Sequence, residues 1–599
     1  MIAIYSVISN PFSTERTSDL RKSYYTGIVC ILLCALTLVD SRAFFGPYLL
    51  AAVYALYCLH SNQSLSIDRK SKPYRIITVA SLICAVFVVL ANYGIWIHPV
   101  SLDVRTPMFV RLCKATYILI IMSGSFVSVL NILIRLVYVR NVPAFGRGGY
   151  TGDKTYRFFL IPFVIMLCVY GAVWIGCYFP GLLSLDSIDQ VRQLITREYS
   201  NHQPFYHTQL LGLFIRPAIA LSGNINAGVA AYIFFQIIVM AATFAFVINN
   251  MAIFGFPKWA CIIATVWYTI MPFHIMYSVT VWKDVLFGAF VTLMIVFFAR
   301  SMNKIGRPAV NYTGFALSSL IICLIRSNGL FAYIFVFAAV ILLARDEAKL
   351  LVIMLFVIIA SFVLKHPVLG MYNVTQPDTV ESLSIPLQQI ARVIADDGKM
   401  SDEDMKFLSE FIDVSAIKDN YDPNISDPIK NMIRDYNNQE YLSSHMADFA
   451  KVYLRTVIHN PLTVVIAWVD STCGYWNSGY SYWIWYWDIE QNDLGISRTV
   501  NSPKMLRFMD EYLWLFYNNR ILQVFTSIGL HVWLVLMFFA KYTVSKCRTG
   551  IISCVTILAI VLSLLVSSPV YSEFRYMYAL FCCLPVLGGM EVKNENNMQ

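Results

Sequence analysis

Long runs of apolar residues, separated by short polar loops, make up most of the chain. A helix needs roughly 20 apolar residues to cross a hydrocarbon core of about 30 Å. A further apolar segment, residues 206–222, is short and contains Arg216. By length and composition we predict fourteen transmembrane helices, at residues 26–42, 44–60, 75–97, 112–135, 157–179, 226–249, 259–277, 284–300, 311–327, 328–345, 349–366, 521–541, 549–568 and 574–590.

The placement of residues 206–222 decides on which side of the membrane every later loop lies. If this segment lies in the interface, the basic loops at residues 300–307, 345–349 and 541–548 are all cytoplasmic, as the positive-inside rule requires. If it crosses the membrane, those loops are translocated, and Arg216 enters hydrocarbon at a cost of about 2.5–3.5 kcal/mol. We therefore predict an interfacial helix here, with both chain termini in the cytoplasm.

Composition agrees with a multi-pass protein of the cell membrane. Of the 599 residues, 58% are hydrophobic and only 14% are charged, against about 25% charged in soluble proteins. The net charge of +9 comes from basic residues in short loops between spans, where they set topology, so we predict no nucleic-acid partner. Most of the fourteen cysteines fall inside apolar runs and form no disulfide or metal-ligand pattern.

The alternation of apolar and polar stretches divides the chain into four regions. Residues 1–150 are predicted as an N-terminal four-helix membrane region, and residues 151–366 as a membrane core whose first outer loop is 180–225. Residues 367–520 are predicted as an extracytoplasmic, mainly helical domain, and 521–599 as C-terminal transmembrane helices with a short cytoplasmic tail. The aromatic residues between Tyr475 and Trp487 fit either an interfacial belt or stacking on sugar rings or a lipid chain.

Two aspartates follow directly on an apolar run in "FPGLLSLDSIDQ". The topology places Asp186 and Asp189 at the outer membrane surface, where charges are costly and often functional. Each aspartate also fits a simpler role as a helix cap. For Asp186, cap and catalyst are left open, whereas the cap is the favoured interpretation of Asp189.

A second polar group begins an otherwise apolar span at "WKD". Lys283 could extend along the helix to the interface and Asp284 could cap the helix N-terminus. Those separate roles leave unexplained why the same outer surface carries Arg326 in "RSNG" and Arg575 in "EFRY". Acids and cations converging from separate helices indicate a site for an anionic group such as phosphate.

The histidines in "HQPFYH" are five positions apart with a proline between them, which is not the spacing of a helical metal pair. Taken singly, each fits an interfacial aromatic residue, and His202 is retained as a substrate contact. The catalytic candidates are Asp186 and Asp284. The candidate substrate-binding residues are Asp189, Gln190, His202, His207, Lys283, Arg326, Asn328, Glu573 and Arg575.

The order of "PGLLSLDSIDQ", "HQPFYH", "WKD", "RSNG", "IPLQQIAR" and "EFRY" resembles a family of uncharacterised bacterial membrane proteins over about residues 155–590. That family in turn looks like the GT-C superfamily of glycosyltransferases, which use sugars linked to a lipid phosphate. The resemblance implies an all-α polytopic fold of about 14 transmembrane helices, with a GT-C-like core and an extracytoplasmic helical domain.

The resemblance also implies an inverting sugar transfer on the outer face of the membrane. The donor would be a polyprenyl-phosphate-linked sugar and the acceptor a glycan or lipid of the cell wall or cell surface. Asp186 would act as general base or orient the acceptor hydroxyl, Asp284 would match the second acidic residue of the family, and Lys283, Arg326 and Arg575 would stabilise the departing phosphate. Many GT-C members place two acids side by side in the first loop, whereas Ser187 follows Asp186 here, so a divalent metal stays open.

Two other functions fit a membrane protein of this composition. A transporter or flippase for a lipid-linked sugar would place ionisable residues near the midplane and show paired broken helices. The spans between 226 and 366 are nearly free of mid-helix charge, and no internal repeat is visible, which favours chemistry at the surface. A non-catalytic scaffold for cell-envelope assembly would keep its function in an Asp186→Asn variant.

Overall fold

The computed structural model describes residues 67–91, 93, 108–138, 156–477, 484–519 and 522–590. Within these residues the fold is helical, and β-structure is limited to isolated bridges. The predicted spans 26–42 and 44–60 and both chain termini lie outside the described residues.

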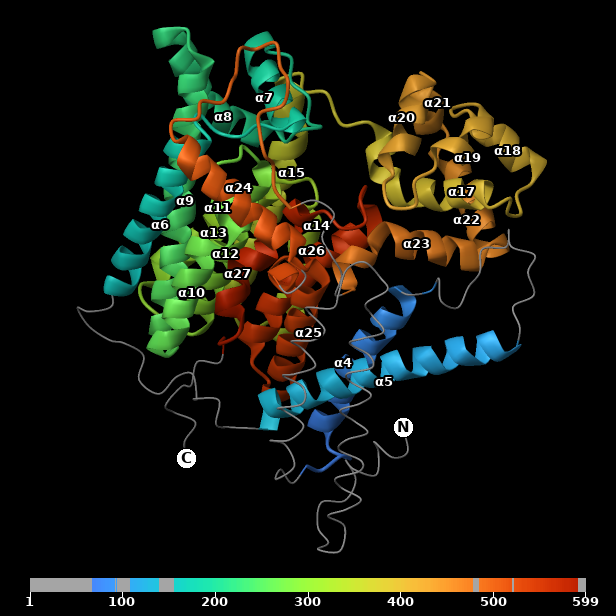
Figure 1. The fold of residues 1–599 in the computed structure, drawn as a ribbon, viewed down its shortest axis with the longest axis horizontal. Helices are drawn as coiled ribbons and strands as arrows, with labels where there is room; N and C mark the ends of the chain where they lie inside the picture. The colour runs from blue at the N-terminus through green and yellow to red at the C-terminus, as the bar shows by residue number, and fades with distance from the viewer. Residues whose placement is uncertain are drawn as a thin grey trace, which may run out of the picture.

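A bundle of apolar helices occupies the left side of the view in Figure 1. Its largest buried cluster draws residues from α6 through to α27 and surrounds α12, in which most residues are buried. Two helices from the N-terminal region, α4 (Lys72–Ala91) and α5 (Met108–Tyr138), pack against α25 through a smaller cluster. The bundle helices are α6 (Arg157–Cys177), α9 (Ile225–Ile253), α10 (Lys258–Ile270), α11 (Pro272–Ser278), α12 (Lys283–Met302), α13 (Pro308–Ile325), α14 (Gly329–Leu343), α15 (Ala348–Val363), α25 (Ile528–Ser545), α26 (Arg548–Ser567) and α27 (Tyr578–Leu587).

Eight helices of the described chain are long and apolar enough to cross a membrane, or ten if each of two bent helix pairs counts as one span. Each predicted span that falls on described residues overlaps helical structure, and 259–277 falls on the bent pair α10 and α11. The span 112–135 lies within α5, whose apolar part is Met122–Tyr138, and the spans 328–345 and 574–590 correspond to shorter apolar helices. One bent pair, Met446–His459 with Pro461–Trp476, was not predicted as a span. The described part of the chain therefore has the helix lengths and composition of a polytopic membrane protein.

Proline marks the breaks in both bent pairs. α10 and α11 meet at Met271–Pro272 with a bend of 54°, and α22 and α23 meet at Asn460–Pro461 with a bend of 106°. Proline has no N–H to continue the helical ladder, and it disfavours the helical conformation of the residue before it. Each proline then begins the next helix, where a missing N–H has no cost.

Three further helices lie against the bundle: α7 (Leu185–Thr196), α8 (Phe205–Ser222) and α24 (Pro503–Asn518). In Figure 1, α7 and α8 lie at the upper end of the bundle. α8 is the segment predicted as interfacial, and it is not among the helices apolar enough to span. Its Arg216 is exposed and donates to the Tyr199 hydroxyl at 2.7 Å. Placement of α8 in the membrane interface remains a prediction.

A separate helical unit follows α15, drawn in yellow to orange at the upper right of Figure 1. Its own buried cluster runs from Val380 to Val452. Ser401 caps α18 by accepting from the Asp404 N–H. The unit, called the helical unit below, comprises η4 (Thr379–Leu383), α17 (Ser384–Ala395), α18 (Asp402–Ser409), η5 (Val414–Ala416), α19 (Ile417–Asn420), α20 (Asp427–Asp435), α21 (Gln439–Ser444) and α22 (Met446–His459).

The remainder of region 367–520 packs with the bundle as well as with the helical unit, because α23 also contacts α17. α23 (Pro461–Trp476) contacts α25, and the aromatic side chains of Tyr475, Trp476 and Trp485 are buried in the main cluster. These three aromatic residues therefore serve packing, whereas residues 478–483 of the same aromatic stretch lie outside the described residues. The side of the membrane on which the helical unit lies remains a prediction.

Candidate functional site

The chain that follows α6 is joined to the chain that precedes α12. Leu182 exchanges backbone hydrogen bonds with Val279 (2.8 Å) and Val281 (2.9 Å). The indole N–H of Trp282 donates to the Ser184 hydroxyl at 2.9 Å. These bonds place the start of α7 beside the start of α12, so the two predicted acids lie near each other. Asp186 and Asp284 each occupy the first turn of their helix, where the helix dipole favours a negative charge.

Asp186 is paired with Arg575. The guanidinium Nη1 lies 2.8 Å from the carboxylate Oδ2, and the side chains are 33% exposed for Asp186 and 17% for Arg575. Arg575 also lies 3.4 Å from Glu573 and covers the ring of Trp282, with 5.7 Å from the guanidinium carbon to the ring centre. Arg575 thus links the segment after α26 to the starts of α7 and α12.

Asp284 forms a second, more deeply buried ion pair with Arg326. Their side chains are 1% and 8% exposed, and the closest nitrogen–oxygen distance is 2.5 Å. Neither carboxylate oxygen of Asp284 has a hydrogen-bond partner among the described residues. Arg326 stands at the break between α13 and α14 and lies over the ring of Tyr576 at 4.7 Å. A buried charge of this kind requires its partner, because an unpaired one is costly to desolvate.

Lys283 completes the polar cluster by donating to the Gln203 side-chain oxygen at 2.6 Å. Acids and cations from α7, α12 and the segment before α27 therefore surround one small pocket. Its lining residues are Asp186, Ser187, Gln190, Gln203, Val281, Trp282, Lys283, Asp284 and Arg575.

The charges of the cluster set the protonation of its acids. Burial of Asp186 opposes ionisation, but the cations of Arg575 and then Lys283 outweigh it and lower the carboxyl pKa to about 2. Glu573 behaves in the opposite way: burial raises its pKa to about 7, with Arg575 opposing the change and Asp284 adding to it. Asp186 is therefore ionised at neutral pH, while Glu573 titrates near it.

Six of the predicted substrate-binding residues do not line the pocket: Asp189, His202, His207, Arg326, Asn328 and Glu573. Asp189 is exposed and pairs with Arg192 at 3.0 Å. His202 is exposed beside the pocket and contributes a small lowering of the Asp186 pKa. Asn328, at the start of α14, donates to the Ser563 hydroxyl at 2.9 Å.

His207 is fully buried and does not line the pocket. Its Nδ1 lies 3.0 Å from the Gln190 amide nitrogen and its Nε2 lies 2.9 Å from the Tyr232 hydroxyl. Burial, with a smaller effect of Lys283, lowers the pKa of His207 to about 3, so the ring is neutral at physiological pH. His207 connects α8 to α7 and α9, and through Gln190 it fixes the helix that carries Asp186.

Several residues of the site were not predicted. Gln203 lies between the two histidines of "HQPFYH" and was passed over in favour of them, although a buried amide beside a lysine is a specific contact. Ser187 donates from its hydroxyl to the Val281 carbonyl, and Tyr576 stacks on both arginines. Lys365 donates to the Arg326 carbonyl at 3.2 Å from a turn of π-helix, η3 (Leu364–Val368). Nothing in the local sequence distinguishes these residues from residues that serve only packing.

The described residues do not offer a metal-binding group. No cluster of three or more histidine, cysteine, aspartate or glutamate side chains is placed to hold an ion in this part of the chain. Asp186 and Asp284 are each paired with an arginine instead.

Comparison of the sequence with models of protein families assigns the chain to one family. Residues 194–598, more than half of the chain, match a family described as a family of unknown function (DUF6020), and the chain belongs to that family. Lys283, Asp284, Arg326, Glu573 and Arg575 lie inside the matched range. Asp186 precedes it. Neither the curated proteins nor the solved structures contain a match to this chain.

Proposed function

We propose that this protein is a membrane glycosyltransferase that moves a sugar from a polyprenyl phosphate to a hydroxyl of a glycan or lipid on the outer face of the cell membrane. The observation that carries the proposal is the ion pair of Asp186 with Arg575 in the lining of a small pocket that Lys283 and Asp284 also line. A carboxylate with reactive access and a set of cations are the two things that such a transfer requires.

The donor phosphate fits the cationic part of the cluster. Lys283 and Arg575 both line the pocket, and Arg326 lies behind them on Asp284. Arginine presents several N–H donors in a plane that matches phosphate oxygens. In the proposed complex, Arg575 exchanges part of its contact with Asp186 for the phosphate, and Lys283 neutralises a second oxygen.

The acceptor reacts at Asp186, which is the more exposed of the two paired aspartates. The acceptor oxygen attacks the anomeric carbon from the face opposite the phosphate, and its proton passes to the Asp186 carboxylate. The bond from that carbon to the phosphate oxygen breaks, and polyprenyl phosphate leaves with the electron pair. When Arg575 turns to the phosphate, the pKa of Asp186 rises from its low value, which makes the carboxylate a better base at the moment of transfer.

Asp284 has a different task in this scheme. Because it is buried and paired with Arg326, it holds that arginine in place rather than meeting the acceptor. Two acids therefore take two roles that follow from their surroundings: Asp186 accepts the proton, and Asp284 orients a cation.

The test uses the full chain in lipid vesicles with a polyprenyl-phosphate-linked sugar and a hydroxyl acceptor. We expect sugar transfer with release of polyprenyl phosphate, and a fall of roughly 10²–10⁴-fold in the Asp186→Asn variant. The control is Asp493→Asn, which changes an exposed carboxylate that is also paired with an arginine but lies outside the pocket. Equal turnover of Asp186→Asn and the parent protein removes the proposed base. Movement of the intact lipid-linked sugar across the bilayer without its release supports the flippase instead.

A further inference from the structure

The segment that carries Glu573 and Arg575 into the site is short and is held from two sides. It comprises residues 568–573, between the end of α26 at Ser567 and the start of η7 (Phe574–Met577), and is called the connecting segment below. Glu573 is its last residue, and Arg575 follows two positions later. Contacts that hold the connecting segment in place therefore also hold Arg575, which pairs with Asp186.

The first contact comes from the end of α23. The Tyr475 side chain is fully buried, and its hydroxyl donates to the Val570 carbonyl at 2.9 Å and accepts from the Glu573 N–H at 3.1 Å. It also lies 2.9 Å from the Ser568 hydroxyl. One phenol oxygen thus holds both ends of the connecting segment.

The residue before Tyr475 allows this close approach. The Gly474 N–H donates to the Tyr571 carbonyl at 3.1 Å. A Cβ atom at position 474 would lie 2.1 Å from the Cβ of Ser572, which no side chain can tolerate without a shift of the backbone. The absence of a side chain at Gly474 therefore lets α23 meet the connecting segment through main-chain contacts.

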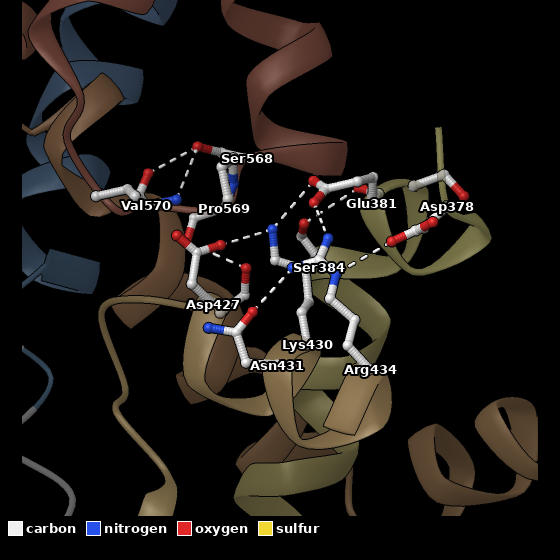
Figure 2. A network of polar contacts seen from close by, with 12 residues as sticks. Asp378, Glu381, Ser384, Asp427, Lys430, Asn431, Arg434, Ser568, Pro569 and Val570 are labelled. Carbon is white, nitrogen blue, oxygen red and sulfur yellow. Dashed lines mark hydrogen bonds and ion pairs between the residues drawn. The ribbon is translucent and has the colours of Figure 1, made fainter. Parts of the chain in front are cut away.

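The second contact comes from the helical unit. The Ser426 N–H donates to the Pro569 carbonyl at 2.8 Å, and the Tyr571 N–H donates to the Asn424 carbonyl at 3.0 Å. Ile425 and Val570 form an antiparallel bridge between them. Figure 2 shows Ser568, Pro569 and Val570 beside the start of α20. The connecting segment is therefore paired with the loop that leads into α20.

An ionic network makes this attachment point rigid (Figure 2). The Lys430 side chain is 2% exposed, and its ammonium lies 2.6 Å from Asp427 and 3.1 Å from Glu381. Arg434 adds ion pairs to Glu381 and to Asp378, the latter at 3.1 Å. Because Asp427 directly follows Ser426, the network ties the bridging loop to η4 and so to the body of the helical unit.

We propose that Tyr475 is a positioning residue for Arg575, and that the helical unit acts on the Asp186–Arg575 pair through the connecting segment. The contacts run without interruption from Lys430 and Ser426, through Pro569 and Val570, to Glu573 and Arg575. The consequence for catalysis rests on the proposed function. The electrostatic effect on residue 186 does not, and it can be measured without any sugar substrate.

The test converts Asp186 to a thiol whose protonation reports how close Arg575 lies. A cysteine beside arginine and lysine has a thiol pKa below the ordinary value of about 8.5, and only the thiolate reacts quickly with an alkylating agent. The full-length Asp186→Cys protein is labelled with iodoacetamide between pH 5 and 9, and mass spectrometry follows the peptide that contains residue 186. We expect Tyr475→Phe to raise the thiol pKa, which moves the midpoint of the labelling-rate profile to higher pH.

Two further variants make the result specific. Tyr542→Phe is the matched control, because the Tyr542 hydroxyl is equally buried, accepts from the Met590 N–H at 3.0 Å and donates to a carbonyl in the same way. Ser426→Pro removes the donor to Pro569 from the side of the helical unit and leaves α23 intact. We expect Ser426→Pro to raise the thiol pKa and Tyr542→Phe to leave it unchanged.

The outcomes separate the parts of the proposal. An unchanged thiol pKa in Tyr475→Phe overturns the positioning role of Tyr475. An unchanged value in Ser426→Pro overturns the action of the helical unit. Failure of the parent protein to transfer sugar removes the proposed function but leaves this measurement standing.

Discussion

The guanidinium of Arg575 lies 2.8 Å from the carboxylate of Asp186, although 389 positions separate the two residues in the chain. The pair joins α7, which follows α6, to the segment that precedes α27. It also explains why Asp186 stays ionised in a partly buried site, since the arginine and Lys283 lower its pKa to about 2 despite desolvation. In the proposed reaction, Asp186 can accept a proton only after Arg575 has paired with another anion, the donor phosphate.

Replacement of Arg575 tests this relationship through the pH dependence of transfer. The acid limb of kcat/KM reports the pKa of the base in the free enzyme. In the parent protein that limb lies near pH 2, so ionisation of Asp186 contributes no pH dependence between pH 4 and 8. In Arg575→Gln we expect the limb to move up to or above the ordinary aspartate value of about 3.9, and kcat/KM at pH 7 to fall roughly 10²–10³-fold.

Steady-state kinetics across this pH range measure both effects. Arg192→Gln is the matched control, because Arg192 also pairs with aspartates but is exposed and lies outside the pocket. A profile for Arg575→Gln that stays flat to pH 4 contradicts the assignment of Asp186 as the base that Arg575 controls.

The buried pair of Asp284 and Arg326 predicts non-additive losses of stability. Asp284→Asn leaves a buried guanidinium without its counter-charge, at a cost of about 3–5 kcal/mol by comparison with other broken buried pairs. Arg326→Gln leaves the carboxylate uncompensated at a similar cost. We expect the double variant to lose markedly less than the sum, because neither charge remains.

Thermal unfolding in detergent gives the four stabilities of this double-mutant cycle. The pair Arg548 and Asp346 provides a matched cycle, because both side chains are exposed and surface pairs contribute about 0–1 kcal/mol. Additive losses at Asp284 and Arg326 would show that the two charges do not depend on each other.

Glu573 predicts a loss of stability as pH rises. Burial raises its pKa to about 7, above the ordinary glutamate value of about 4.3. Between these values the folded protein holds a proton that the unfolded chain has released, so this group lowers the free energy of unfolding as pH rises from about 4.5 to 7. We expect Glu573→Gln to remove this pH dependence of the free energy of unfolding. The variant should therefore lose less stability than the parent protein between pH 5 and pH 8.

The difference between the two unfolding curves isolates Glu573 from other groups. His207 acts in the opposite direction below pH 6.5, because its lowered pKa makes stability rise with pH there, but it is present in both proteins. Glu410→Gln, which changes an exposed glutamate of the helical unit, serves as the control. Parallel curves for the parent protein and Glu573→Gln between pH 5 and 8 are the contrary result.

The helices of the bundle were predictable from the sequence for a simple physical reason. In lipid, a run of about 20 apolar residues can satisfy its backbone hydrogen bonds only as a helix. Residues 157–179 and 226–249 are runs of this kind, so helices could be predicted there. The ends and breaks were harder. Pro272 can be read in the sequence, but the 54° bend at this residue depends on how α10 and α11 pack. The 106° bend before Pro461 explains why the apolar helix α23 was assigned to the polar domain at residues 367–520.

The site was predictable as a set of residues but not as a set of pairs. Charges at helix ends near lipid indicated Asp186, Asp284, Arg326 and Arg575, and the structure brings them together. Which cation pairs with which acid depends on contacts between distant segments of the chain. Local sequence patterns carry no information about such contacts. The roles of Gln203 and Tyr475 were not predictable for the same reason, because they consist of hydrogen bonds to partners far along the chain.

The close approach of α23 to the connecting segment predicts an unusual effect of adding one methyl group. Alanine in place of glycine inside a helix usually stabilises by about 1 kcal/mol. At Gly474 the new Cβ would lie 2.1 Å from that of Ser572 and 2.8 Å from the Tyr571 carbonyl, so we expect Gly474→Ala to lower the melting temperature instead. Ser572→Gly removes the nearer of these atoms and should restore part of the loss in the double variant. Gly171→Ala in α6, where a Cβ meets nothing within 4 Å, is the control expected to keep or raise the melting temperature. A Gly474→Ala protein as stable as Gly171→Ala would mean that α23 and the connecting segment are not in direct contact.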